Sequence, residues 1–251
     1  FMLILYKANN KGEGGIFLLF TLIKNKHKWI YFPAIIGACA LLGDGVITPA
    51  MTVTSAVEGV VKFFPDLNVV LIVVTIISIL FFAQQFGTYK LGKYFGPIMF
   101  IWFSLLLILG IFSLSNYPTI LKALNPIYAI QLIIHYPSSL AFLGAVFLVT
   151  TGAEALYSDL GHCGIKNIRI SWIFVKLSLI LNYFGQGAWL ISHESTWNSS
   201  INPFFVIMPN WLLPYGVIIA TLAAIIASQA LISGSYTIVS EAISLNFFPK
   251  I

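Results

Sequence analysis

The stretch PAIIGACALLGDGVITPAMTVTSAVEGVV, residues 33–61, decides the fold, because it is apolar and long enough to cross a bilayer. A single carboxylate, Asp44, lies about a dozen residues inside it. A carboxylate at that depth costs at least ~2.5–3.5 kcal/mol on insertion scales, so its default interpretation is functional. The stretch therefore predicts a transmembrane helix that carries a functional acidic group.

Oxygen-bearing side chains recur along one face of this predicted helix. On a 3.6-residue period, the side chains that fall close to one stripe are Asp44, Thr48, Thr52, Ser55 and Glu58. The stripe offers carboxylates and hydroxyls, with no lysine or arginine to pair them. Such a lining is typical of a cation path, because these groups replace a hydration shell. Glu58 lies nearer the outer end, where it is either a vestibule group or solvated.

Glycine and proline residues surround Asp44. Gly43 and Gly45 let another backbone or an ion approach closely, and Pro49 removes a backbone hydrogen bond and frees a carbonyl oxygen. Transporters coordinate cations at broken helices with exposed carbonyls. The alternative is a packing seam of small residues that holds one structural aspartate.

The composition fixes the class as an all-α polytopic membrane bundle. Hydrophobic residues make up 59% of the 251 residues and charged residues only 8%, whereas ordinary globular domains have ~25% charged residues. The formal charge of +5 includes a single arginine, Arg169, so no nucleic-acid partner is expected. The two cysteines, Cys39 and Cys163, indicate small buried residues rather than a disulfide framework or a metal site.

Six apolar stretches are predicted to span the membrane, with no soluble domain. They are residues 33–61, 67–86, 95–114, 140–160, 173–191 and 213–240. Residues 16–23 are too few to cross and predict a short surface helix.

The basic residues orient these spans. Threading six spans places ten on one side: Lys7, Lys11, Lys24, Lys26, Lys28, Lys90, Lys93, Lys166, Arg169 and Lys250. Lys62 and Lys122 lie on the other side, and Lys176 lies at the entrance of a span. The basic side is expected to be cytoplasmic. The outer loops are then Asn116–Pro137 and Ser192–Pro214.

A second acidic site is predicted in the fourth span. Glu154, Tyr157 and Ser158 share a helix face, and the segment 150–152 before them is Thr-Thr-Gly, where a helix could break. Glu154 and Asp44, on two different spans, are therefore expected to form a two-helix acidic site. His162 stands apart from the other histidines, so no metal site is expected.

The last two spans carry further polar residues. Asn182 and Gln186 are expected to face the bundle as packing groups. Ser228, Gln229 and the segment 233–236 form a small polar cluster, for which close packing and hydroxyl ligation are equally good explanations. The chain shows no nucleophile–base pair, so an enzyme is not expected.

The segment GDGVITPAMTVTSAVEG, residues 43–59, closely resembles the signature of the Kup/HAK/KT family of potassium uptake permeases. Further segments resemble the family in its order: NNKGEGGI at 9–16, QQFGTYKLGKYFGPIMFIWF at 84–103, ALNPIYAI at 123–130, TGAEALYSDLGHCGIKNIRISW at 151–172, LNYFGQGAWL at 181–190, NPFFVIMPNW at 202–211 and TLAAIIASQALISGSY at 221–236.

The resemblance implies a proton-coupled potassium importer with the inverted-repeat fold of the amino-acid/polyamine/organocation superfamily. It associates Asp44, Thr52 and Glu154 with ion binding or coupling. Family members often have serine where Thr52 stands. The chain would correspond to the end of the family's second span through its eighth. The first span, the last four or so spans and the C-terminal domain are then outside it, and the segment alone is expected to insert without transporting.

Potassium and a proton are thus the expected ligands, with Thr48 also a direct ligand, and Ser55, Glu58, Tyr157, Ser228 and Gln229 secondary candidates. No cofactor is expected. Membrane lipid and the rest of the same protein are the expected partners, and a homodimer remains open.

The alternatives are channel-like potassium flux without proton coupling and an amino-acid permease on the same fold. A channel favours repeated pore loops of carbonyls, and an acidic stripe opposes an anionic substrate. A multi-pass protein of the plasma (inner) membrane is expected.

Overall fold

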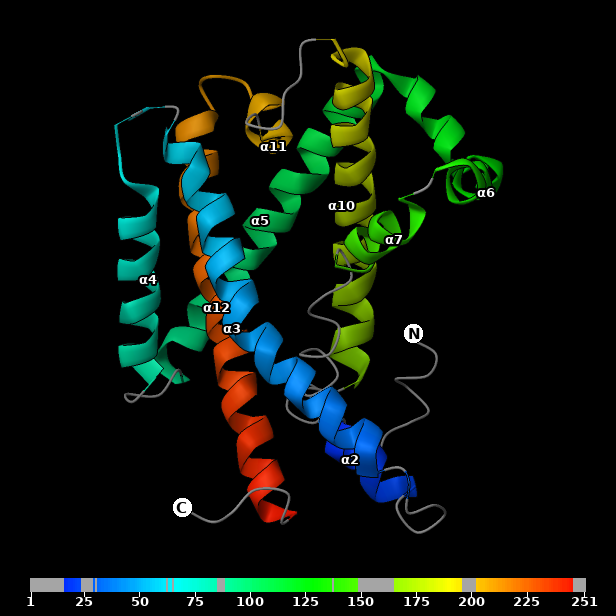
Figure 1. Cartoon of the computed structure of the whole chain (residues 1–251). Coiled ribbons are helices and arrows are strands. Elements are labelled where there is room, and N and C mark those ends of the chain that lie inside the picture. Colours follow the sequence, from blue (N-terminus) through cyan, green and yellow to red (C-terminus); the bar gives the residue numbers. More distant parts are fainter. Residues whose placement is uncertain are drawn as a thin grey trace. The chain divides into compact units, whose positions relative to one another are not determined.

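The structure is a computed structural model that describes residues 16–23, 29, 31–61, 63–64, 66–84, 89–136, 138–148, 165–195 and 202–245. Within these ranges every regular element is a helix (Figure 1). The chain divides into two compact units. An all-helical bundle is thereby confirmed for the described residues.

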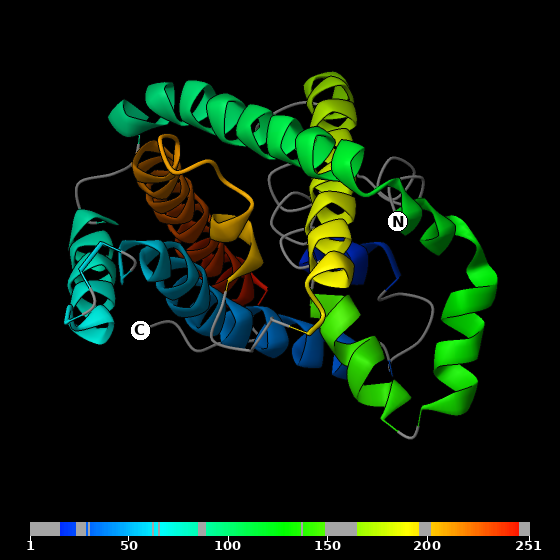
Figure 2. The same cartoon turned by 90° about the horizontal axis from the view of Figure 1, so that it is seen from above.

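The first unit comprises Phe1–Met99, Glu154–Trp172 and Val217–Ile251. Its helices are α2 (Ile16–Ile23), α3 (Tyr31–Val61), α4 (Val69–Gln84), the starts of α5 (Tyr89–Asn116) and α10 (Ile165–Ser192), and most of α12 (Leu213–Ser244). Both ribbon views show α3 and α12 side by side and running in opposite directions (Figures 1 and 2). This antiparallel pair forms the centre of the unit.

The short helix α2 is a packed element of this unit. Its Phe17 is only 3% exposed and forms a buried cluster with Ala38 of α3 and Ala242 of α12. The helix predicted at residues 16–23 is confirmed, but its packing is deeper than a surface helix implies.

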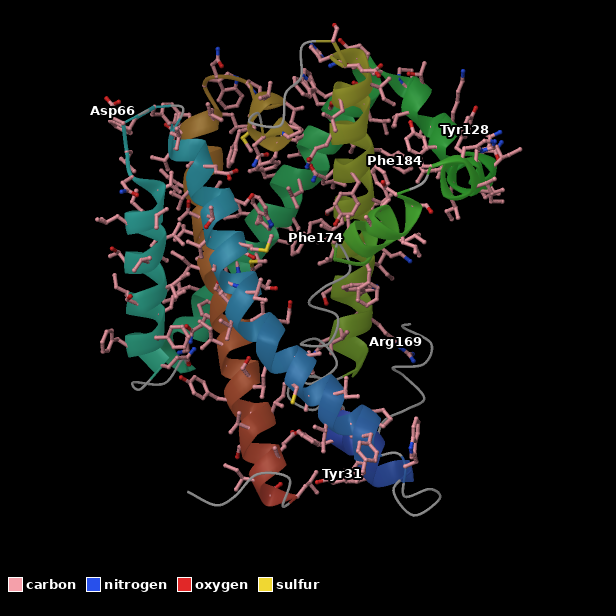
Figure 3. The ribbon with its side chains drawn as sticks, viewed as in Figure 1. Tyr31, Asp66, Tyr128, Arg169, Phe174 and Phe184 are labelled. Carbon is pink, nitrogen blue, oxygen red and sulfur yellow. The ribbon has the colours of Figure 1, made fainter. Side chains whose placement is uncertain are left out.

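Helix α3 buries a stripe of small residues and exposes large ones. Pro33 lies in the first turn, where a missing N–H costs nothing. The buried stripe includes Gly45, Pro49 and Val53, while Val46 is 72% exposed. Pro49 is accommodated within a continuous helix, so the helix break that it suggested does not occur. Figure 3 shows Tyr31 and Asp66 near the two ends of α3, so Asp44 lies well inside.

The second unit comprises Phe100–Ala153 and Ile173–Gly216. It contains the rest of α5 and α10, the 3-10 helix η2 (Pro118–Leu124), α6 (Pro126–His135), α7 (Ser139–Leu148), α11 (Pro203–Val206) and the first turn of α12. Helices α5 and α10 pack tightly. Their aromatic rings Phe100 and Phe174 stack with centroids 5.2 Å apart.

The predicted outer loop 116–137 is largely helical, because its Asn-Pro pair starts a helix. Asn125 accepts a hydrogen bond from the Ile127 N–H at 3.1 Å, and Pro126 begins α6. Asn202 and Pro203 start α11 in the same way.

Four described helices are long and apolar enough to cross a membrane: Tyr31–Val61, Lys93–Asn116, Asn167–Ser192 and Leu213–Ser244. They match four of the six predicted spans. At the predicted span 67–86, α4 has 16 residues, or about 24 Å, which is short of the roughly 30 Å hydrocarbon core. At 140–160 only α7, which ends at Leu148, is described. The full set of six spans stays a prediction.

Candidate functional site

The predicted oxygen stripe on α3 is a hydrogen-bonded ladder. The Thr48 hydroxyl donates to Asp44 Oδ1 at 2.5 Å, and the Thr52 hydroxyl donates to the Thr48 carbonyl at 2.7 Å. The four-residue spacing places each hydroxyl one turn above its acceptor. The three side chains therefore share one face, which confirms the geometry expected of them, while ion ligation by them remains a prediction.

The other carboxylate oxygen of Asp44 is buried without a partner. Among the residues that the structure describes, Asp44 Oδ2 has no hydrogen-bond partner. Helix α3 carries no lysine or arginine between Tyr31 and Val61. Leaving a buried acceptor unpaired costs about 1–3 kcal/mol, and more for a charged group. Asp44 is thus half-satisfied, with one oxygen held in place by Thr48 and the other available.

The two outer members of the stripe lie in a different environment. Ser55 and Glu58 are exposed, whereas Asp44, Thr48 and Thr52 are half-buried. The oxygen face therefore runs from the interior of the unit to its surface. Glu58 is therefore better interpreted as a vestibule group at the exposed end of the stripe than as a ligand in the interior.

Gly45 permits a close approach between α3 and α12. A Cβ atom placed on Gly45 would collide with the Ser235 hydroxyl and lie 3.8 Å from the Leu231 carbonyl oxygen. No atom lies within 4 Å of a Cβ placed on Gly43. Of the two flanking glycines, only Gly45 is therefore required for packing. Its carbonyl also lacks the usual helical donor, because the residue four positions later is Pro49.

Helix α12 brings two more polar side chains into the interior of the unit. Ser228 is 0% exposed and Gln229 is 4% exposed. Within the described ranges, the Ser228 hydroxyl and both amide atoms of Gln229 have no hydrogen-bond partner. The rest of the polar cluster differs: the segment 233–235 is half-buried and Tyr236 is 57% exposed.

A separate polar contact joins α5 and α10 in the second unit. The Ser113 hydroxyl donates to the Gly185 carbonyl at 2.7 Å, and Asn182 is 4% exposed. A Cβ on Gly110 would lie 2.5 Å from the Leu181 carbonyl carbon. The expected packing role of Asn182 is consistent with this contact, whereas Ser113 was not predicted. Its spacing of three residues from Gly110 is the signal that could have found it.

Two sets of predicted residues give a different outcome. Glu154, Tyr157 and Ser158 lie outside the described residues, so the two-helix acidic site stays a prediction. In the part of the chain that is described, no three His, Cys, Asp or Glu side chains group as metal ligands. Sequence reasoning also missed Gln84 at the end of α4, whose buried amide nitrogen has no hydrogen-bond partner among the residues that the structure describes.

Comparison with known proteins gives matches along the whole chain. The family of the K+ potassium transporter integral membrane domain matches residues 1–251. A "Probable potassium transport system protein Kup" of Flavobacterium psychrophilum is 56% identical over 257 residues, covering 100% of this chain and 39% of that protein. Proteins of the same printed name from Clostridium perfringens and Enterococcus faecalis are 56% and 52% identical, each over 100% of this chain and 40% of their own length.

The chain thus spans about two-fifths of the length of these curated relatives. No solved structure matches it.

Proposed function

The chain belongs to the family of the K+ potassium transporter integral membrane domain, and from this premise we propose that it carries potassium ions across the membrane as part of a proton-coupled uptake system. The curated relatives that it matches are named as potassium transport system proteins. The ladder on α3 supplies the chemistry that such a role needs.

The observation that carries the proposal is the half-satisfied carboxylate of Asp44. Thr48 holds one carboxylate oxygen, and the other is buried without a partner in the described structure. A potassium ion that sheds water needs hard oxygen atoms and a compensating negative charge. Asp44 supplies the charge, and the hydroxyls of Thr48 and Thr52 supply neutral oxygens beside it.

The hydrogen bonds of the ladder decide which lone pairs face the ion. The Thr48 hydroxyl donates its hydrogen bond to Asp44, and the Thr52 hydroxyl donates its hydrogen bond to the Thr48 carbonyl. Both hydroxyl oxygens therefore keep lone pairs for a cation. In this arrangement the ladder is oriented before an ion arrives, which lowers the cost of binding.

Proton coupling is assigned to the two intramembrane carboxyl groups, Asp44 and Glu154. A carboxylate that holds either a cation or a proton exchanges one for the other, and so links their movements. Because the proposal assigns Asp44 to the potassium ligands, Glu154 is the better candidate for carrying the proton.

The surroundings proposed for the chain are the plasma (inner) membrane and an inverted-repeat transporter fold. Large apolar side chains such as Ile36, Met51 and Phe82 are 64–71% exposed, as expected of faces that contact lipid. Helices of spanning length agree with this placement.

The test is potassium uptake by bacteria that lack their own uptake systems and express the protein from its complete gene. We expect growth at limiting potassium, with uptake that falls when the proton gradient is collapsed. Uptake that ignores the gradient would favour the channel alternative. An absence of potassium uptake by protein that reaches the membrane would refute the proposal.

A further inference from the structure

Helices α3 and α12 pack in a register that one contact fixes. A Cβ on Gly45 would collide with the Ser235 hydroxyl, so these two positions meet at the centre of the seam between the helices. The helices run antiparallel within the first unit (Figure 1). Moving toward the end of α3 therefore means moving toward the start of α12.

This register places Ser228 opposite Thr52. Seven residues are almost two helical turns, so a residue seven positions away points within about 20° of the same direction. Thr52 follows Gly45 by seven residues, and Ser228 precedes Ser235 by seven. Both lie about 10 Å along the seam from the Gly45–Ser235 contact, on the faces that meet there.

The seam is closed around this level. Val53 on α3 is 0% exposed, and Ala224, one turn before Ser228 on α12, is 3% exposed. The Ser228 side chain is itself fully buried and, within the described residues, its hydroxyl has no partner. A buried hydroxyl without a partner, on a helix whose own carbonyls are within reach of serine, is unusual. Ser235 on the same face donates to its own helix, to Leu231 at 2.9 Å.

One further oxygen is available at the level of Ser228. Thr52 donates its proton to the Thr48 carbonyl, so the lone pairs of its hydroxyl remain. With Ser228 it forms a pair of neutral oxygens from two helices, about two turns beyond Asp44.

We propose that Ser228 is a potassium ligand at a position between α3 and α12, which it shares with the Thr52 hydroxyl. The inference rests on the proposed function and extends the proposed ion site along the seam to a second helix. Neutral oxygens suit a weakly hydrated monovalent ion, whereas divalent ions need carboxylates. Gln229, next along α12 and 4% exposed, carries an amide oxygen at the same level that has no partner within the described ranges.

The competing explanation is that Ser228 is a small residue kept for close helix packing. The two explanations predict different effects of removing the Ser228 hydroxyl. A ligand sets the affinity and the preference among potassium, rubidium and caesium, whereas a packing residue sets the amount of folded protein.

The experiment measures uptake against potassium concentration in the protein expressed from its complete gene, with abundance in the membrane measured beside it. Ser228→Ala is expected to raise the KM for potassium about tenfold to hundredfold, the range seen when a group supporting a metal site is lost. It is also expected to change the ratio of rubidium to caesium uptake. Ser228→Thr, which keeps the hydroxyl, should stay near the parent, and Ser228→Cys, of similar size, should resemble Ser228→Ala.

Ser235→Ala is the matched control, because it removes a hydroxyl from the same face that is already satisfied. We expect it to leave KM and ion preference unchanged. An unchanged KM and preference in Ser228→Ala and Ser228→Cys would overturn the inference, as would an equal effect in Ser235→Ala. Failure of the parent protein to take up potassium would instead refute the proposed function.

Discussion

At the scale of single residues, the proposed site rests on the different environments of the two carboxylate oxygens of Asp44. One accepts a hydrogen bond from Thr48, and the other is buried without a partner in the described structure. The hydrogen bond from Thr48 orients the carboxylate, and the second oxygen is the one that we propose holds a cation. The charge and its orientation can therefore be tested separately.

Removing the charge is the more severe change. Asp44→Asn is expected to abolish or severely impair potassium uptake, because the amide no longer offsets the cost of dehydrating the ion. Insertion should be intact or eased, since a neutral side chain is cheaper in lipid. Growth at limiting potassium and rubidium tracer uptake measure the effect. Rescue of growth equal to that of the parent would contradict it.

Removing the orienting hydroxyl tests the ladder. Thr48→Val keeps the shape of the side chain and deletes the bond to Asp44. A hydrogen bond to a charged group contributes about 1.5–3 kcal/mol, so the KM for potassium is expected to rise tenfold or more. Thr48→Ser restores the hydroxyl and should recover most of the loss. Equal KM values for the valine and serine variants would show that the hydroxyl does not orient Asp44.

The role of Glu154 in coupling is tested through pH. A glutamine cannot carry a proton, so Glu154→Gln is expected to weaken proton-driven accumulation more than ion binding. Uptake is measured against external pH in the variant and the parent. A variant with full accumulation and an unchanged pH profile would remove Glu154 from the coupling role.

Sequence reasoning reached the α3 ladder because its spacing is local. Positions four apart share a helix face whatever the rest of the fold does, so Asp44, Thr48 and Thr52 could be grouped in advance. The pairing of Gly45 with Ser235 depends on two segments far apart in the chain, and no local pattern specifies it. For the same reason, the sequence could name Ser228 as a candidate ligand but could not show which residue of α3 it faces.

At the scale of helices, glycine positions decide how closely α5 and α10 approach. A Cβ on Gly185 would lie 2.8 Å from the Gly110 Cα atom and 2.9 Å from its carbonyl oxygen. Backbone atoms cannot move aside as flexible side chains do. The Ser113–Gly185 hydrogen bond depends on the same approach.

Gly185→Ala is therefore expected to destabilise the folded protein by about 1–3 kcal/mol, the usual cost of overpacking. Thermal unfolding in detergent measures it. Gly96→Ala is the control, because Gly96 lies in α5, the helix that α10 packs against, and nothing comes within 4 Å of its Cβ position. A melting temperature of Gly185→Ala equal to that of Gly96→Ala would contradict the expected clash.

The long helices were predicted correctly because the length of an apolar run is enough to identify them. Helices α3, α5, α10 and α12 match predicted spans because an apolar run of twenty or more residues has few alternatives. The helices η2 and α6 were missed because their segment was assigned to a loop from its place between two spans. Asn125 and Pro126 carried the local signal for the start of α6.

At the scale of the whole molecule, the chain aligns along its full length with relatives that are longer than it is. It is 56% identical to the Flavobacterium psychrophilum protein over 257 residues, which amount to 39% of that protein. In the inverted-repeat fold that we propose for the chain, the ion lies between repeats, so the groups described on α3 and α12 are expected to act together with further helices. This dependence can be tested by supplying those helices from the relative.

A chimaera in which residues 1–251 replace the matching segment of the Flavobacterium psychrophilum protein is expected to take up potassium. Pairs of residues in contact across the new boundaries couple by about 0.5–3 kcal/mol, so the rate should fall within roughly a hundredfold of the intact relative. Uptake by potassium-dependent cells measures it. The chimaera with Asp44→Asn is the control and should be inactive, because the carboxylate then comes from this chain alone. Potassium uptake by the Asp44→Asn chimaera equal to that of the unsubstituted chimaera would show that the ladder on α3 is not an ion site.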